Sequence, residues 1–92
     1  MIQEMNPEKM MELFEELADR LHIELVLGTG DFVGGSCILK NQKYVILNKK
    51  HPIESRLKIL ASEFHSMDVA DVYIVPALRE FIEEKSSIEP RN

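Results

Sequence analysis

The stretch from Gly28 to Cys37 has the residue types most suited to chemistry. Its sequence, Gly-Thr-Gly-Asp-Phe-Val-Gly-Gly-Ser-Cys, contains all four glycines of the chain and its single cysteine. A dinucleotide-binding loop requires Gly-x-Gly-x-x-Gly between a strand and a helix. Here the third glycine comes one residue late, and the residues after it read as a strand. The spacing therefore favours a wide turn or bulge between two strands.

A small-molecule or anion site at this turn remains an alternative. Backbone N–H groups would bind the ligand, with Lys40 or Lys43 nearby. In the middle of the turn, Phe32 would either fold back as an anchor or stand exposed as a contact residue, and Asp31 could brace the turn. The candidate ligand-binding residues are Gly30, Asp31, Phe32, Gly34, Gly35 and Cys37.

Thiol and metal chemistry are weakly indicated. A nucleophilic cysteine needs a nearby base and some exposure, but none of the histidines (His22, His51 and His65) has a diagnostic spacing from Cys37. A lone cysteine on a strand is usually a small buried hydrophobe. His65 and Asp68 have no clear third ligand, whereas zinc takes three or four. We therefore expect a non-enzymatic protein without metal or cofactor, and keep an enzyme using Cys37 with a histidine as an alternative.

A helix of about fifteen residues is predicted near the N-terminus. Asn6 is a good N-cap, Pro7 suits the first helical position, and Glu8 favours the first turn. Apolar residues recur at intervals of three and four on one face: Met10, Leu13, Phe14, Leu17, Ala18 and Leu21.

Three short strands are predicted next, at 22–27, 36–40 and 43–48. The first alternates apolar and polar residues, as a half-buried strand does. Residues 40–43, Lys-Asn-Gln-Lys, predict a tight hairpin turn in which asparagine tolerates positive φ. Residues 44–47 are apolar on both faces, which is typical of a central strand.

Two further helices begin at the prolines Pro52 and Pro76. Between them, Asp68 could cap a short turn, and residues 71–75 are compatible with a strand or a helical turn. The order of elements predicts an α+β fold: an N-terminal helix, a three-stranded antiparallel meander with a hairpin, and two C-terminal helices packed on the sheet. Residues 1–85 would form a single domain and 86–92 a frayed tail.

Composition narrows the classes of function. The chain has 92 residues, of which 45% are hydrophobic and 29% charged, as in globular domains. It has no apolar run long enough to span a membrane and no signal peptide, and its single cysteine fits a reducing cytoplasm. The net charge of −5 argues against a nucleic-acid binder, although residues 40–58 contain six of the eleven basic residues and one acidic residue, Glu54.

The chain resembles two groups of proteins. The helix E-E-L-A-D-R-L-H-I-E-L, the glycine-rich turn, the hairpin strand Y-V-I-L-N-K-K and the helix R-L-K-I-L-A-S-E-F-H-S resemble the core of the ImmA/IrrE-type metallopeptidases over about residues 12–66. The family's helix bears Ala-His-Glu-x-x-His. The resemblance puts Ser62 and Ser66 at the positions of the zinc-binding histidines and carries over only Glu63, which implies a catalytically dead scaffold. The chain is also similar to short bacterial proteins of unknown function that share Gly-Asp-Phe-x-Gly-Gly-x-Cys and D-V-Y-I-V-P-A-L-R-E; that likeness implies no activity.

These observations predict a protein-interaction module that binds a protein partner or a second copy of itself as a homodimer. An apolar patch would be buried between the partners, framed by the acidic first helix and the basic segment 40–58. The third helix is the expected contact element, because an amphipathic C-terminal helix can dock on a neighbour. Its candidate face consists of Tyr73, Leu78, Phe81 and Ile82.

Overall fold

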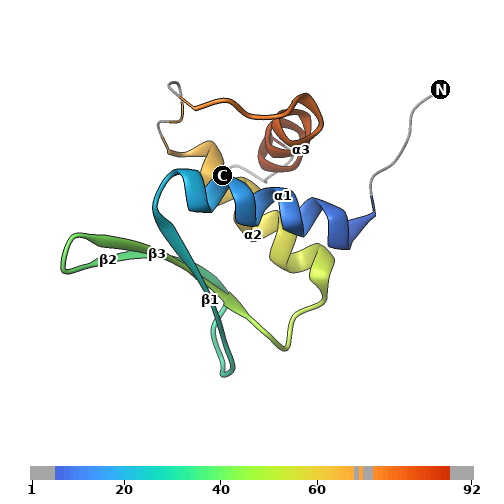
Figure 1. The fold of residues 1–92 in the computed structure, drawn as a ribbon. Helices are drawn as coiled ribbons and strands as arrows, with labels where there is room; N and C mark the ends of the chain where they lie inside the picture. The colour runs from blue at the N-terminus through green and yellow to red at the C-terminus, as the bar shows by residue number, and fades with distance from the viewer. Residues whose placement is uncertain (1–5, 68, 70–71, 88–92) are drawn as a thin grey trace.

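Three helices and three strands follow one another in the computed structural model (Figure 1), which describes residues 6–67, 69 and 72–87. The elements are α1 (Pro7–Arg20), β1 (Ile23–Gly28), β2 (Gly34–Leu39), β3 (Gln42–Asn48), α2 (Ile53–His65) and α3 (Pro76–Ser87). This order confirms the predicted α+β class. Residues 88–92, most of the predicted tail, and Asp68, the predicted cap, lie outside the described residues.

The first helix begins as its sequence predicts. Oδ1 of Asn6 accepts a hydrogen bond from the backbone N–H of Lys9 at 2.7 Å, and Pro7 occupies the first helical position. The buried face of α1 consists of Met10, Phe14, Leu17 and Ala18. The predicted apolar stripe is therefore the face that packs into the core.

The sheet differs from the predicted meander. Its strand order is β1-β3-β2, with β1 parallel and β2 antiparallel to β3. The antiparallel meander is therefore wrong, because a meander would place β2 in the centre and β1 antiparallel to it. The predicted central position of β3 is confirmed. A strand that is apolar on both faces gains most from a neighbour on each side, whereas the glycine-rich β2 is largely exposed and forms an edge.

A two-residue turn joins β2 to β3. Leu39 pairs with Gln42, and the two residues between them, Lys40 and Asn41, have φ angles of 52° and 69°. Positive φ at both central positions is the type I′ conformation, which matches the twist of a hairpin. The predicted hairpin is confirmed, with the turn one residue earlier than predicted.

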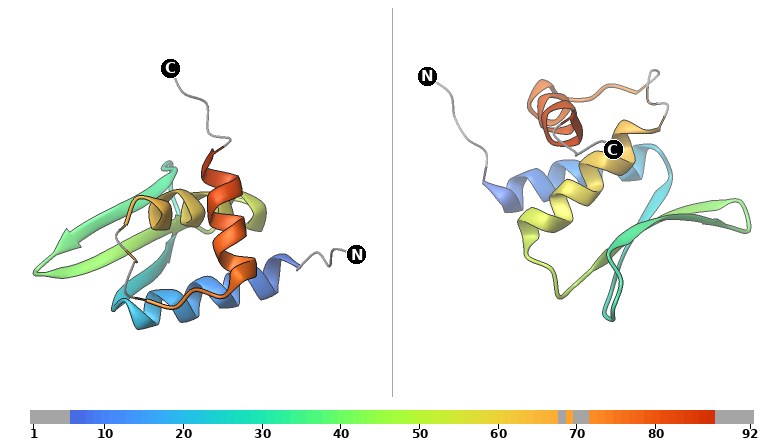
Figure 2. Two further views of the ribbon diagram at one scale, coloured as in Figure 1. Left: turned by 90° about the horizontal axis from the view of Figure 1, so that it is seen from above. Right: turned by 180° about the vertical axis from the view of Figure 1, so that it is seen from behind.

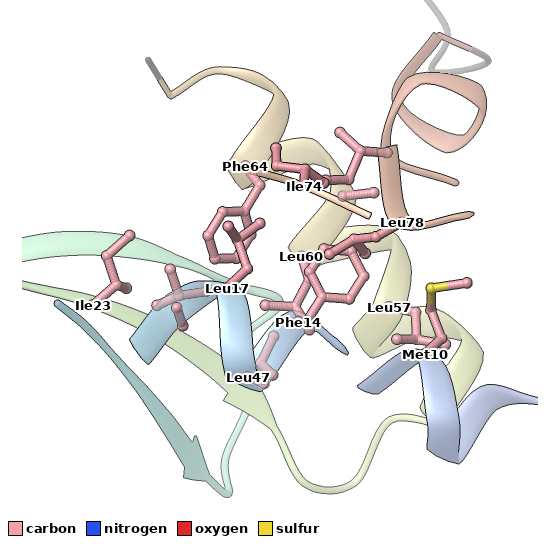
Figure 3. Close-up of a cluster of buried hydrophobic side chains, with 14 residues drawn as sticks. Met10, Phe14, Leu17, Ile23, Leu47, Leu57, Leu60, Phe64, Ile74 and Leu78 are labelled. Atoms are coloured by element: carbon pink, nitrogen blue, oxygen red, sulfur yellow. The ribbon is translucent and has the colours of Figure 1, made fainter. Parts of the chain in front are cut away.

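The helices lie on one side of the sheet (Figures 1 and 2). Contacts to the strands come from α1 and α2, while α3 packs on α2 and α1. The core lies between these layers, where the Phe14 ring lies beside the Phe64 ring (Figure 3). Its centroid is 5.6 Å from that of Phe64 and 5.9 Å from that of Phe81. Phe14 has no exposed surface, so this ring links α1 to both C-terminal helices.

The segment before α3 is neither strand nor helix over residues 72–75. It is nevertheless fixed to the domain, because Ile74 is buried in the core and the carbonyl oxygen of Tyr73 accepts a hydrogen bond from Arg20 at 3.2 Å. Within the described part of the chain, no helix has the length and apolar character needed to cross a membrane.

Candidate interaction surface

The glycine stretch connects two strands that flank β3. Gly28 lies beside Asn48 in the parallel pair, and Gly34 lies beside Leu47 in the antiparallel pair. Residues 29–33 therefore cross over the C-terminal end of β3. The buried side chain of Asn48 holds this crossover: its Nδ2 donates to the carbonyl oxygens of Gly30 and Phe32 at 2.8 and 2.7 Å.

Asn48 completes its hydrogen bonding on the other side. Its Oδ1 accepts the backbone N–H of Lys50 at 3.0 Å, so one amide ties the crossover to the segment that leaves the sheet. A buried polar side chain is stable only when its groups are paired in this way. Asn48 was not among the predicted site residues, although an asparagine that ends an otherwise apolar strand was the available signal.

Glycine is required at the start of β2. Gly34 has a φ of 123°, and a Cβ atom there would lie 2.7 Å from the carbonyl oxygen of Ile46. Nearby, the half-buried ring of Phe32 rests on two other glycines, since a Cβ atom at Gly28 or Gly30 would lie 3.4 or 3.3 Å from ring carbons. Phe32 is therefore the anchor of the crossover, which is one of its two predicted roles.

The residues predicted to bind an anion do not lie together in one loop. Gly30, Asp31 and Phe32 lie in the crossover, whereas Gly34, Gly35 and Cys37 are spread along β2. The expected cations are misplaced: Lys40 and Lys43 lie at the hairpin turn, at the opposite end of the sheet from Gly28. The lysines that follow the crossover end of β3 are Lys49 and Lys50, and the backbone N–H of Lys49 donates to the Gly28 carbonyl oxygen at 2.7 Å.

The face of the sheet that points away from the helices is here called the outer face. In β3, Val45 and Leu47 are buried beneath the helices, while Tyr44 and Ile46 point to the other side and are half-buried. The register adds their neighbours in β1 and β2. The outer face consists of Glu24, Val26, Gly35, Cys37, Leu39, Gln42, Tyr44 and Ile46. It is a mainly apolar surface that no described helix covers.

The edge strand β2 exposes the largest apolar side chains of the hairpin. Ile38 and Leu39 are 68% and 59% exposed and point to opposite faces, because successive strand residues alternate. The hairpin projects beyond the helices (Figure 1). Natural edge strands are usually protected by charges, prolines or bulges, but Gly34–Leu39 contains no charged residue and no proline.

The predicted contact face on the third helix is mostly internal. Leu78 and Ile82 are 2% and 6% exposed, and Phe81 packs edge-on against Phe14. Tyr73 alone stands clear, with 66% of its surface exposed. Thus α3 docks on its own chain, and the four residues do not form one accessible face.

Cys37 and the two positions that the resemblance implies for zinc ligands can be located among the described residues. Cys37 is free and exposed, not the buried residue expected, and no described group of three or more His, Cys, Asp and Glu residues is placed to hold a metal. Of the two positions implied for zinc ligands, Ser62 lies in α2 and Ser66 follows its last residue, His65. The Ser66 hydroxyl donates to the carbonyl oxygen of Glu63 at 2.8 Å, so it serves to cap the helix end.

No family model, curated protein or solved structure matches this chain.

Proposed function

We propose that the chain is a non-enzymatic protein-interaction module that associates with a second copy of itself through the sheet. The observation that supports the proposal best is the unprotected edge strand β2, with Ile38 and Leu39 exposed on its two faces. An unpaired strand edge offers a row of backbone donors and acceptors. Exposed apolar side chains beside those groups add a favourable contribution from burial.

Charge restricts where two copies can meet. The net charge of −5 gives two copies a general repulsion, so a contact between them must lie where like charges are absent. Gly34–Leu39 meets this condition. The first helix does not, because its exposed side bears Glu8, Glu12, Glu15, Glu16 and Asp19.

Sedimentation velocity over a concentration series tests the proposal. The wild-type chain is expected to shift from monomer to dimer within the range up to about 100 μM, where weak homodimers become populated. Ile38→Lys puts a charge on the exposed edge and should weaken the dimer at least tenfold, which corresponds to about 1.4 kcal/mol.

Tyr73→Lys is the matched control. Tyr73 and Ile38 have similar exposures, 66% and 68%, so both substitutions add a lysine at an exposed apolar site without emptying the core. The Tyr73 variant should dimerise like the wild type. A wild-type chain that is monomeric at every concentration contradicts the proposal, as does a dimer that Tyr73→Lys abolishes and Ile38→Lys leaves intact.

A further inference from the structure

We infer that two copies pair β2 with β2 in antiparallel orientation, about a two-fold axis that passes between their Cys37 residues. This inference rests on the proposed self-association and adds its geometry. It produces one continuous six-stranded sheet of order β1-β3-β2-β2-β3-β1 from two three-stranded sheets.

The hairpin shows which backbone groups of β2 are free. In a two-residue hairpin, the pair that flanks the turn is the hydrogen-bonded kind, and the kinds alternate along the ladder. Leu39–Gln42 flanks the turn, so Cys37–Tyr44 is hydrogen-bonded as well. The N–H and C=O groups of Ser36 and Ile38 therefore point away from β3, toward the open edge.

Symmetry restricts the register. A two-fold axis that pairs a strand with itself keeps the helices of both copies on the same side, so residues of the same face must meet. Only registers centred on a residue satisfy this condition. Two such registers pair five residues of each β2 with five residues of the other. The register centred on Ser36 pairs residues 34–38, and the register centred on Cys37 pairs residues 35–39.

The register centred on Cys37 fits the side chains better. It pairs Ile38 with Ser36 and Leu39 with Gly35 of the second copy, so each large exposed residue meets a small one. A register centred on Ser36 would leave Leu39 beyond the paired segment. The Cys37 register joins the free groups of Ser36 and Ile38 in two hydrogen-bonded pairs, and the Ser36 register would form three, so the choice rests on the fit of the side chains.

Sequence at the two edges favours β2 over β1. Around the proposed axis, Ser36, Cys37 and Ile38 carry no charge, so no like charges meet. The other edge strand, β1, has an exposed glutamate, Glu24, at its second position, and a charge on an edge strand disfavours pairing with another strand.

Disulfide cross-linking measures the register directly. Cys37 and its copy would form a non-hydrogen-bonded pair with Cα atoms about 4.5 Å apart, within the range of about 4.4–6.8 Å that a disulfide spans. Diamide is the oxidant: it takes up two hydrogens as the two thiols form one S–S bond. The wild-type chain should convert to a covalent dimer, scored on a non-reducing gel.

Two variants in the Cys37→Ser background provide the controls. With Ser36→Cys, the new thiols are two positions apart across the axis, about 7–8 Å, and should cross-link at least tenfold more slowly. Ser62→Cys, on the exposed side of α2, measures random collision and should also be slow.

The outcomes separate the inference from the proposed function. Fast cross-linking of Cys37 alone supports the Cys37 register. Fast cross-linking through Ser36→Cys, or a sedimenting dimer whose Cys37 reacts no faster than the Ser62→Cys control, overturns it while leaving self-association intact. A chain that remains monomeric in sedimentation overturns both.

Discussion

Replacing Ile38 with proline tests the open edge of β2 without removing a backbone hydrogen bond between β2 and β3. Hydrogen-bonded pairs alternate with non-hydrogen-bonded pairs along β2 and β3. Because Cys37–Tyr44 is a hydrogen-bonded pair, the N–H of the next residue, Ile38, points to the open edge. Proline lacks an N–H group and is tolerated on edge strands where that group would face solvent. Ile38→Pro should therefore preserve the monomer and weaken only the dimer.

The size of the effect follows from the proposed register. Two Ser36–Ile38 pairs exchange four backbone hydrogen bonds across the axis, and proline in both copies removes two of them. At a net 0.5–1.5 kcal/mol each, the loss is about 1–3 kcal/mol, which weakens the dimer about 5- to 150-fold. The free energy of unfolding of the monomer should change by less than about 1 kcal/mol, as for other exposed substitutions.

Sedimentation velocity gives the dimer constant, and urea unfolding at a concentration where the chain is monomeric gives the stability. Cys37→Pro is the matched control, one position away. It removes the N–H that bonds to Tyr44, so it should lower the free energy of unfolding by about 1–3 kcal/mol. The reasoning is refuted if Ile38→Pro destabilises the monomer as much as Cys37→Pro does, or if it leaves the dimer constant unchanged.

Two further substitutions test how the crossover is held. Asn48→Ala removes a buried amide that donates to the carbonyl oxygens of Gly30 and Phe32 and accepts from Lys50, so urea unfolding should show a loss of about 2–4 kcal/mol; a loss below about 1 kcal/mol would mean that the crossover does not depend on this side chain. Gly34→Ala should lower the unfolding midpoint more than Gly35→Ala, because the Cβ at Gly34 meets the Ile46 carbonyl oxygen at 2.7 Å whereas nothing lies within 4 Å of the one at Gly35. Equal midpoints would show that only the backbone conformation matters there, since both glycines have positive φ.

The helices and the hairpin were predictable because their signals are local. Asn6 and Pro7 fix the start of α1, and a periodic apolar stripe marks the buried face whatever it packs against. Lys40 and Asn41 form the two-residue turn with both φ angles positive, a conformation that asparagine readily adopts.

The order of the strands was not predictable from such signals. Whether a five-residue link makes a bend or a crossover depends on what lies beneath it, and here that is Asn48, distant in sequence from Gly30 and Phe32. The apolar character of β3 on both faces did indicate a central strand. That observation is incompatible with a three-stranded meander, in which the second strand is central, and it was the more reliable of the two predictions.

The burial of the predicted contact face on α3 was not predictable for a related reason. An amphipathic helix has the same sequence pattern whether its apolar side meets its own domain or a partner, so Leu78 and Ile82 could not be assigned to the core before the fold was known. Conversely, Ile38 and Leu39 look like ordinary strand residues. Their exposure follows only from the edge position of β2 and from a hairpin that extends beyond the helices.

Pairing through β2 also explains how the assembly would stop at two copies. Once the two β2 edges meet, the open edges of the six-stranded sheet are the two β1 strands, each with the exposed Glu24. A two-fold contact uses the same surface on both copies and is closed, so no second β2 edge remains to continue a fibre. Because both helical layers lie on the same side of that sheet, the outer faces of the two copies join into one surface, and Tyr44 and Ile46 stay accessible to another partner.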